Sequence, residues 1–174
     1  MPQLDVIRHD VTRDALPDAA FDLVHARLLV MHLADKAAAL RCMIAALKPG
    51  GWLIVEDFDS DQPIETMPVA FSALRQAMQA RGIDVHWGAA QAEALRALGL
   101  ADVDAEGAAM HWRAGTPAAV LMDANYRALR EDVLRSGLVS AQELDEELAR
   151  VNGSAFRMRS PIMWTTWGRR RYAV

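Results

Sequence analysis

The stretch that decides the fold consists of Phe-Asp-Leu-Val-His-Ala-Arg at residues 21–27 and Leu-Lys-Pro-Gly-Gly-Trp-Leu-Ile-Val-Glu-Asp at residues 47–57. Each part contains a short apolar run, and the residues between them carry an amphipathic pattern. Apolar side chains recur there at spacings of three and four, at Leu40, Met43, Ile44 and Leu47. Two apolar runs around an amphipathic segment predict a strand, helix, strand unit of a parallel sheet.

The boundaries of this unit also follow from local chemistry. Asp35 can cap the helix, which must stop at Lys48 because Pro49 disfavours the α conformation in the residue before it. Gly50 permits a left-handed turn after the helix. The run from Trp52 to Val55 is then expected to be a strand that is buried on both faces of the sheet.

The rest of the chain extends this unit. A short β-prone run, Leu4 to Arg8, precedes a loop that continues to Asp18. Phe21 to His25 is the next expected strand, and the remaining elements follow in order. They are a helix through Phe71, Leu74 and Met78 ending near Gly82, a helix ending at Gly99, a strand over Val103 to Arg113, a helix starting at Thr116-Pro117, a helix opened by a Ser140–Glu143 capping box and ended by Asn152-Gly153, and a last, antiparallel strand over Ile162 to Trp167.

Composition limits the classes of function. At 174 residues and 52% hydrophobic, residues 1–174 are expected to form a single domain. A net charge of −4 argues against a nucleic-acid partner, which would call for a basic face. The one cysteine, Cys42, excludes an internal disulfide and suits a reducing compartment. No apolar run has membrane-spanning length and no histidine or cysteine pattern predicts a metal site, so we expect a cytoplasmic protein without metal.

The strand pattern at residues 21–24 and the Leu-Lys-Pro-Gly-Gly turn at residues 47–51 resemble the class I, Rossmann-like S-adenosylmethionine-dependent methyltransferases. Asp10, Leu16-Pro17 and His32-Leu33 add to the match. The resemblance implies an α/β fold with a partial Rossmann-like sheet, mostly parallel with an antiparallel last strand, and helices on both faces. It also implies methyl transfer from S-adenosylmethionine to a small-molecule acceptor.

The resemblance further implies a set of cofactor-binding residues. Asp10 would accept a hydrogen bond from the adenine amino group, since an ionised carboxylate is an acceptor only, and the Val11 N–H would meet a ring nitrogen. The backbone of His25, Ala26 and Arg27 would contact the methionine portion of the cofactor, and Leu28 would line the pocket. The alternative for Asp10 is that it starts a turn before Thr12.

Acceptor-binding and catalytic candidates lie at the same edge of the sheet. Arg27, Asp57 and Trp87, the last in the connection Gly82 to Gly88, are candidates for binding the acceptor. His25 and Glu56 are the catalytic candidates, and a partly buried Glu56 could have its pKa raised and act as a general base. The alternative is that these polar residues are simply the solvated exits of two strands.

One part of the family pattern is absent. The sequence has no Gly-x-Gly, the motif with which the family holds the amino acid portion of the cofactor. The chain starts at what corresponds to the third family strand, so roughly 60 residues of the usual fold would be missing. The strand Leu4 to Arg8 would then lose its neighbour and either pair with Phe21 to His25 or pair with another subunit, unless the remaining edge is covered in a dimer.

This omission leaves a second function open. The chain could be a truncated, non-enzymatic methyltransferase remnant that acts as a homodimer or binds a partner through its open sheet edge. A nicotinamide-dependent oxidoreductase would need the same glycine loop and is disfavoured.

Overall fold

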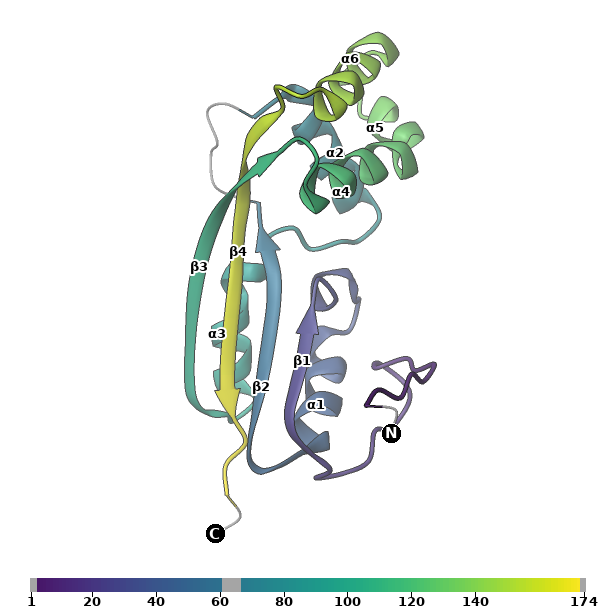
Figure 1. Cartoon of the computed structure of the whole chain (residues 1–174). Coiled ribbons are helices and arrows are strands. Elements are labelled where there is room, and N and C mark those ends of the chain that lie inside the picture. The colour runs from purple at the N-terminus through teal and green to yellow at the C-terminus, as the bar shows by residue number, and fades with distance from the viewer. Residues whose placement is uncertain (1–2, 61–66, 173–174) are drawn as a thin grey trace.

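The computed structural model describes residues 3–60 and 67–172 of the chain. Its centre is a four-stranded sheet in the order β1-β2-β4-β3 (Figure 1). The strands are β1 (Phe21–Arg27), β2 (Leu47–Asp59), β3 (Ala101–Arg113) and β4 (Arg157–Arg169). β1 and β2 are parallel, whereas β4 is antiparallel to both of its neighbours. Three strands therefore run in one direction and the last runs against them, which confirms the α/β class and the antiparallel last strand.

Two helices cover one face of this sheet. They are α1 (Lys36–Ala46) and α3 (Trp87–Ala97). Leu40 of α1 and Leu95 of α3 share a hydrophobic core with Leu53 and Val55 of β2. The cap that starts α1 is the predicted one, because the Asp35 side chain accepts a hydrogen bond from the Ala38 N–H at 2.8 Å. The predicted strand, helix, strand unit is thus confirmed.

The other helices gather at one end of the sheet (Figure 1). A second core joins them to the ends of β3 and β4, with Tyr126 and Phe156 fully buried at its centre and the predicted Ser140–Glu143 capping box at the start of one helix. These helices are α2 (Val69–Ala80), α4 (Pro117–Ala128), α5 (Arg130–Arg135) and α6 (Ala141–Asn152). The shortest of the four, α5, is not among the predicted helices.

The second face of the sheet differs from the expectation. β2 alternates along its length, with Leu53 fully buried and Trp52 37% exposed. The prediction that the run Trp52 to Val55 is buried on both faces is therefore wrong. Helices do lie on both faces, but on this second face α4 lines a cavity with Phe58 and Met163 near one end only. A strand covered on one face keeps a period of two in its burial.

The predicted strand Leu4 to Arg8 is also wrong. These residues form no strand, and Leu4, Val6 and Ile7 are 78%, 85% and 68% exposed. A strand needs a neighbour for its backbone N–H and C=O groups, and within the described residues the sheet ends at β1. The arrangement in which this segment pairs with β1 is thereby excluded for the single chain.

None of the helices in the described part of the chain has the length and apolar character that a membrane span needs.

Candidate functional site

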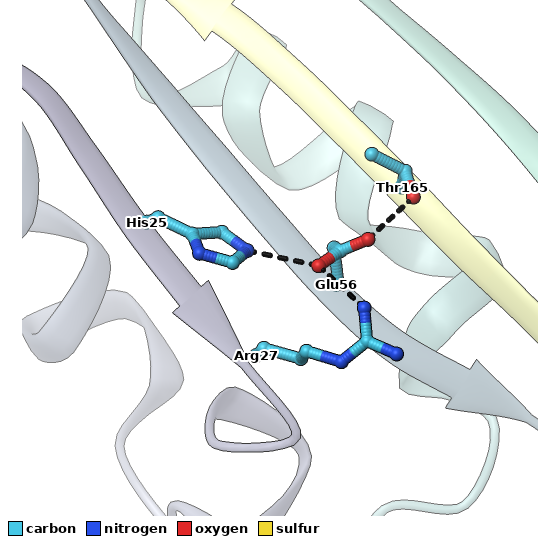
Figure 2. Close-up of polar contacts among 4 residues, drawn as sticks. All are labelled: His25, Arg27, Glu56 and Thr165. Carbon is cyan, nitrogen blue, oxygen red and sulfur yellow. Dashed lines mark hydrogen bonds and ion pairs between the residues drawn. The ribbon is translucent and has the colours of Figure 1, made fainter.

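Polar side chains meet at the carboxyl ends of β1 and β2, on the second face of the sheet (Figure 2). The register places Arg27 opposite Glu56. His25 Nε2 and Arg27 Nη1 each lie 2.9 Å from Glu56 Oε2, and the Thr165 hydroxyl of β4 donates to Glu56 Oε1 at 2.9 Å. The structure therefore brings together three of the predicted residues, with His25 and Arg27 placed around the carboxylate of Glu56. Thr165 is a fourth member that no sequence signal indicated, because it comes from a strand more than a hundred residues away.

The pKa of Glu56 moves in the direction opposite to the expectation. Burial raises it, but the hydrogen bonds from His25, Thr165 and Arg27 together outweigh burial and hold the pKa below its ordinary value. The raised pKa expected for Glu56 is therefore not found, and its general-base role stays a prediction. Nor is this a solvated strand exit, because the Glu56 side chain is only 15% exposed. Glu56 is a fixed anion that orients the residues around it.

His25 has the more useful geometry for proton transfer. Because an ionised carboxylate can only accept, the contact with Glu56 requires a hydrogen on His25 Nε2, and in the neutral ring of that tautomer the lone pair is on Nδ1. The side chain is about half exposed and can be reached from outside. A base held by a carboxylate in this way is the arrangement that enzymes use to orient a proton acceptor.

Asp57 lies on the opposite face from Glu56, because successive side chains of a strand alternate. It is fully buried, and its Oδ2 accepts a hydrogen bond from the Met31 N–H at 3.3 Å. Burial raises the pKa of Asp57 to about 6, against the opposing effect of backbone N–H groups at residues 29–31 and of Lys36. Asp57 was expected to bind the acceptor, but its burial keeps it from the surface that an acceptor could reach. Instead Asp57 holds the turn that follows β1.

The chain leaves β1 through a strained turn. Leu28 has a φ of +50°, in the left-handed region, and its N–H donates to the Glu56 C=O at 2.8 Å. Such a conformation costs a residue other than glycine about 1–3 kcal/mol, and it is found most often where ligands bind. The Ala26 side chain points into the core, so only its backbone can meet a ligand.

Asp10 forms a local turn of its own. Its Oδ1 accepts from the Thr12 N–H at 3.0 Å and from the Thr12 hydroxyl at 2.6 Å. These bonds are the main cause of a lowered pKa, so the carboxylate stays ionised, and its side chain is 49% exposed. The turn before Thr12, which was the alternative for Asp10, is thus present. The second carboxylate oxygen, Oδ2, lies 3.7 Å from Arg13 Nε. Val11 is half-buried and packs against the core under the sheet.

Trp87 does not lie in a connecting loop. It is the first residue of α3, it is 8% exposed, and it belongs to the core beneath the sheet. The reason is the close approach of α3 to β2, since a Cβ on Gly88 would come within 2.7 Å of the Phe58 backbone. The expected contact of Trp87 with an acceptor is therefore not supported by its position.

A cavity of about 350 Å³ adjoins the polar cluster and was not predicted. Arg27 and Leu28 line it at the end of β1, and Phe58, Trp112, Leu121 and Met163 add apolar walls. The rings of Phe58 and Trp112 meet edge to face, with centroids 5.9 Å apart. Its lining comes from all four strands and α4, so no contiguous motif could have indicated it. Among the described residues, no three His, Cys, Asp or Glu side chains are grouped as a metal ion would require.

The family model for the methyltransferase domain matches residues 2–133. Among curated proteins, Methyltransferase str2 of Strobilurus tenacellus is 36% identical over 76 residues, which cover 40% of this chain and 28% of that protein. Phosphoethanolamine N-methyltransferase 1 of Arabidopsis thaliana is 33% identical over 97 residues, covering 56% and 19% respectively. The chain thus spans less than a third of the length of these two relatives.

Solved structures show the same fold. A putative methyltransferase from Bacillus halodurans gives a TM-score of 0.61 at 13% identity, over 98% of this chain and 73% of that one. Phosphoethanolamine N-methyltransferase 2 of Haemonchus contortus, in complex with phosphomonomethylethanolamine and S-adenosylhomocysteine, gives 0.52 at 16% identity, over 94% and 36%. At these identities the likeness concerns the fold alone.

Proposed function

We propose that this chain, which belongs to the family of methyltransferase domains, takes part in methyl transfer from S-adenosylmethionine to a small-molecule acceptor. The observation that carries the proposal is the contact of His25 and Arg27 with Glu56 beside the strained exit of β1. Ligands of open α/β sheets bind outside the carboxyl ends of the strands, where these residues lie. The match to the family model and the bound S-adenosylhomocysteine of the Haemonchus contortus enzyme support the choice of cofactor.

The residues present fit the cofactor at two places. Asp10 offers an ionised, half-exposed carboxylate whose Oδ2 lies 3.7 Å from Arg13 Nε; as a hydrogen-bond acceptor it suits the adenine amino group, and Val11 follows it. At the end of β1 the Leu28 N–H is already used by Glu56 and the Ala26 side chain is buried, so the backbone of residues 25–27 remains for the methionine portion. When bound, the cofactor supplies a methyl group already activated on a sulfonium.

The chain's own residues then have distinct tasks. His25 would accept the proton that the nucleophile of the acceptor gives up, at Nδ1, while Glu56 keeps its ring in place. Arg27 would orient the acceptor from the same edge. Because the methyl group is already activated, holding the two reactants in line supplies much of the acceleration, and no further catalytic group is required.

The outer edge of β1 supports a second proposal, that of a partner. Within the described residues β1 pairs with β2 only, and Phe21 and Leu23 on it are 41% and 53% exposed. An apolar strand edge of this kind is a template for pairing with another chain. We propose that a second copy of this chain, or a partner protein, covers the edge. A non-enzymatic binding module would use the same surface.

Calorimetric titration with S-adenosylmethionine and with S-adenosylhomocysteine tests the proposed function, with the mass in solution determined alongside. We expect saturable binding that Asp10→Asn weakens by about tenfold, since a hydrogen bond to a charged group is lost. Asp5→Asn, which changes an exposed carboxylate on the same segment, is the matched control and should bind as the unchanged chain does. A folded protein that shows no binding at roughly millimolar ligand would rule out the enzymatic proposal and leave the binding module.

A further inference from the structure

The cavity beside Arg27 has a lining that restricts what it can bind. Phe58, Trp112 and Met163 form its apolar walls, and Leu121 of α4, 37% exposed, stands at its rim. Trp112 and Met163 are almost fully buried, and Trp112 belongs to the second core, against which Phe58 also packs. The pocket is partly open to solvent, and a concave, mostly apolar lining with a few polar groups is the usual form of a small-molecule site.

The size of the cavity sets the scale of the ligand. Its volume of about 350 Å³ lies at the small end of the roughly 300–1,000 Å³ that ligand pockets span. Arg27 belongs both to the lining and to the polar cluster, so the apolar volume opens next to His25 and Glu56. A ligand in the cavity would therefore extend from the site of the proposed proton acceptor toward α4.

The charge of the lining favours one class of ligand over another. Among residues 3–60 and 67–172, its ionisable lining side chains are Arg27 and His111, and none of the described lining residues is acidic. The Glu56 carboxylate, which contacts Arg27 of the lining, already has hydrogen bonds to three side chains. The two aromatic rings pack edge to face against each other and do not form a cage for a cation. A cationic ligand would therefore meet a like charge and no counter-ion.

We infer that this cavity binds the methyl acceptor, and that the acceptor is a small molecule with an apolar, ring-sized body and a neutral or anionic group that contacts Arg27. The inference rests on the proposed function, since it assigns the acceptor of the same site. The acceptor inferred here differs from phosphoethanolamine, for which some relatives are named, because that compound carries a phosphate and an ammonium group but no apolar body. The juxtaposition of an apolar cavity with the Arg27 guanidinium carries it, together with a lining that holds no acidic side chain in the described part of the chain.

The test uses three probes that share a naphthalene ring and differ in charge: 2-naphthoate, 2-naphthalenemethanol and 2-naphthylmethylamine. Each is titrated by calorimetry into the full chain without cofactor, and S-adenosylhomocysteine is titrated in parallel. We expect naphthoate and the alcohol to bind at least about fivefold more tightly than the amine, the scale of one partly exposed charge pair. Arg27→Gln should weaken naphthoate by a similar factor and leave the alcohol unchanged. Arg13→Gln, an exposed arginine outside the lining, is its control.

A pair of variants on α4 locates the binding. Leu121→Trp should fill the rim and weaken naphthoate by at least about tenfold, whereas Val120→Trp, at a position 67% exposed and outside the lining, should have no effect. Equal effects of the two variants, an amine that binds as tightly as naphthoate, or no binding of any probe would each overturn the inference. Bound S-adenosylhomocysteine with no probe bound would overturn the inference alone. Bound naphthoate without bound S-adenosylhomocysteine would instead overturn the proposed methyl transfer.

Discussion

Asp57→Asn should remove a pH-dependent loss of stability. Asp57 is fully buried, and burial raises its pKa from 3.8 to about 6. Between these pH values the native protein holds a proton that the unfolded chain has lost, so the free energy of unfolding falls as pH rises through this window and stays lower above it. At about 1.4 kcal/mol for each pKa unit, the fall amounts to about 3 kcal/mol. Asparagine cannot ionise and should abolish it.

The substitution also has an effect that does not depend on pH. The asparagine Oδ1 can still accept from the Met31 N–H, but its amide adds a buried donor whose missing partner costs about 1–3 kcal/mol. The slope of the difference between variant and unchanged chain, rather than its sign at one pH, is therefore the quantity to measure. Other carboxylates titrate in both proteins and cancel in the difference.

Urea unfolding followed by far-ultraviolet circular dichroism, at several pH values from about 4 to about 8, gives this difference. We expect the stability of Asp57→Asn relative to the unchanged chain to increase by about 3 kcal/mol over this range. Asp5→Asn removes an exposed carboxylate and controls for the change in net charge. Parallel pH profiles for Asp57→Asn and the unchanged chain would refute the argument that burial of this carboxylate is costly.

Three further changes test the packing of the fold and the site. Gly88→Ala should destabilise the chain by about 1–3 kcal/mol in urea unfolding, because its Cβ would lie 2.7 Å from the Phe58 backbone; an unchanged midpoint would mean that α3 lies farther from β2. Glu56→Gln should lower the free energy of unfolding by about 1 kcal/mol near neutral pH. Because the pKa of Glu56 is lowered in the fold, this difference should disappear as the pH falls from the ordinary carboxylate pKa through the lowered one, and a difference that does not depend on pH would contradict the argument. Ser140→Ala should lower stability by about 1 kcal/mol through loss of the α6 capping box, and a loss no greater than that of the exposed Ser154→Ala would speak against the cap.

The parts of the fold that could be predicted are those with strong local signals. Asp35 caps α1 as expected and the Ser140 capping box opens α6. α1 ends at Ala46, two residues before Lys48, and Gly50 has the expected positive φ, +84°, but lies within β2. The segment Leu4 to Arg8 shows the limit of such signals. Its β propensity is real, but a strand exists only where another strand satisfies its backbone, and that is a property of the whole sheet.

The part of the site that could be predicted follows from the alternation of side chains along β2, and the rest depends on how distant segments pack. Alternation along β2 already puts Glu56 and Asp57 on opposite faces, but which face is covered depends on where α1 and α3 pack. His86, at the N-cap position of α3, makes no side-chain cap, so the sequence carries no local signal that places Trp87 at the start of the helix. The three partners of Glu56 come from other strands and lower its pKa, whereas burial raises the pKa of Asp57 against the backbone hydrogen bonds that it accepts. Both directions therefore depend on the packing of segments that are distant in the sequence.

Chemical-shift mapping of the nitrogen-15-labelled chain with S-adenosylhomocysteine tests the central claim most directly, because it reports both whether the cofactor product binds and where. We predict that the amide signals of Asp10, Val11 and residues 25–28 shift in a saturable way, while those of α5 and α6 stay unchanged. Shifts confined to the helical end of the molecule, or a folded spectrum that does not respond at all, would contradict a cofactor site at the carboxyl ends of β1 and β2.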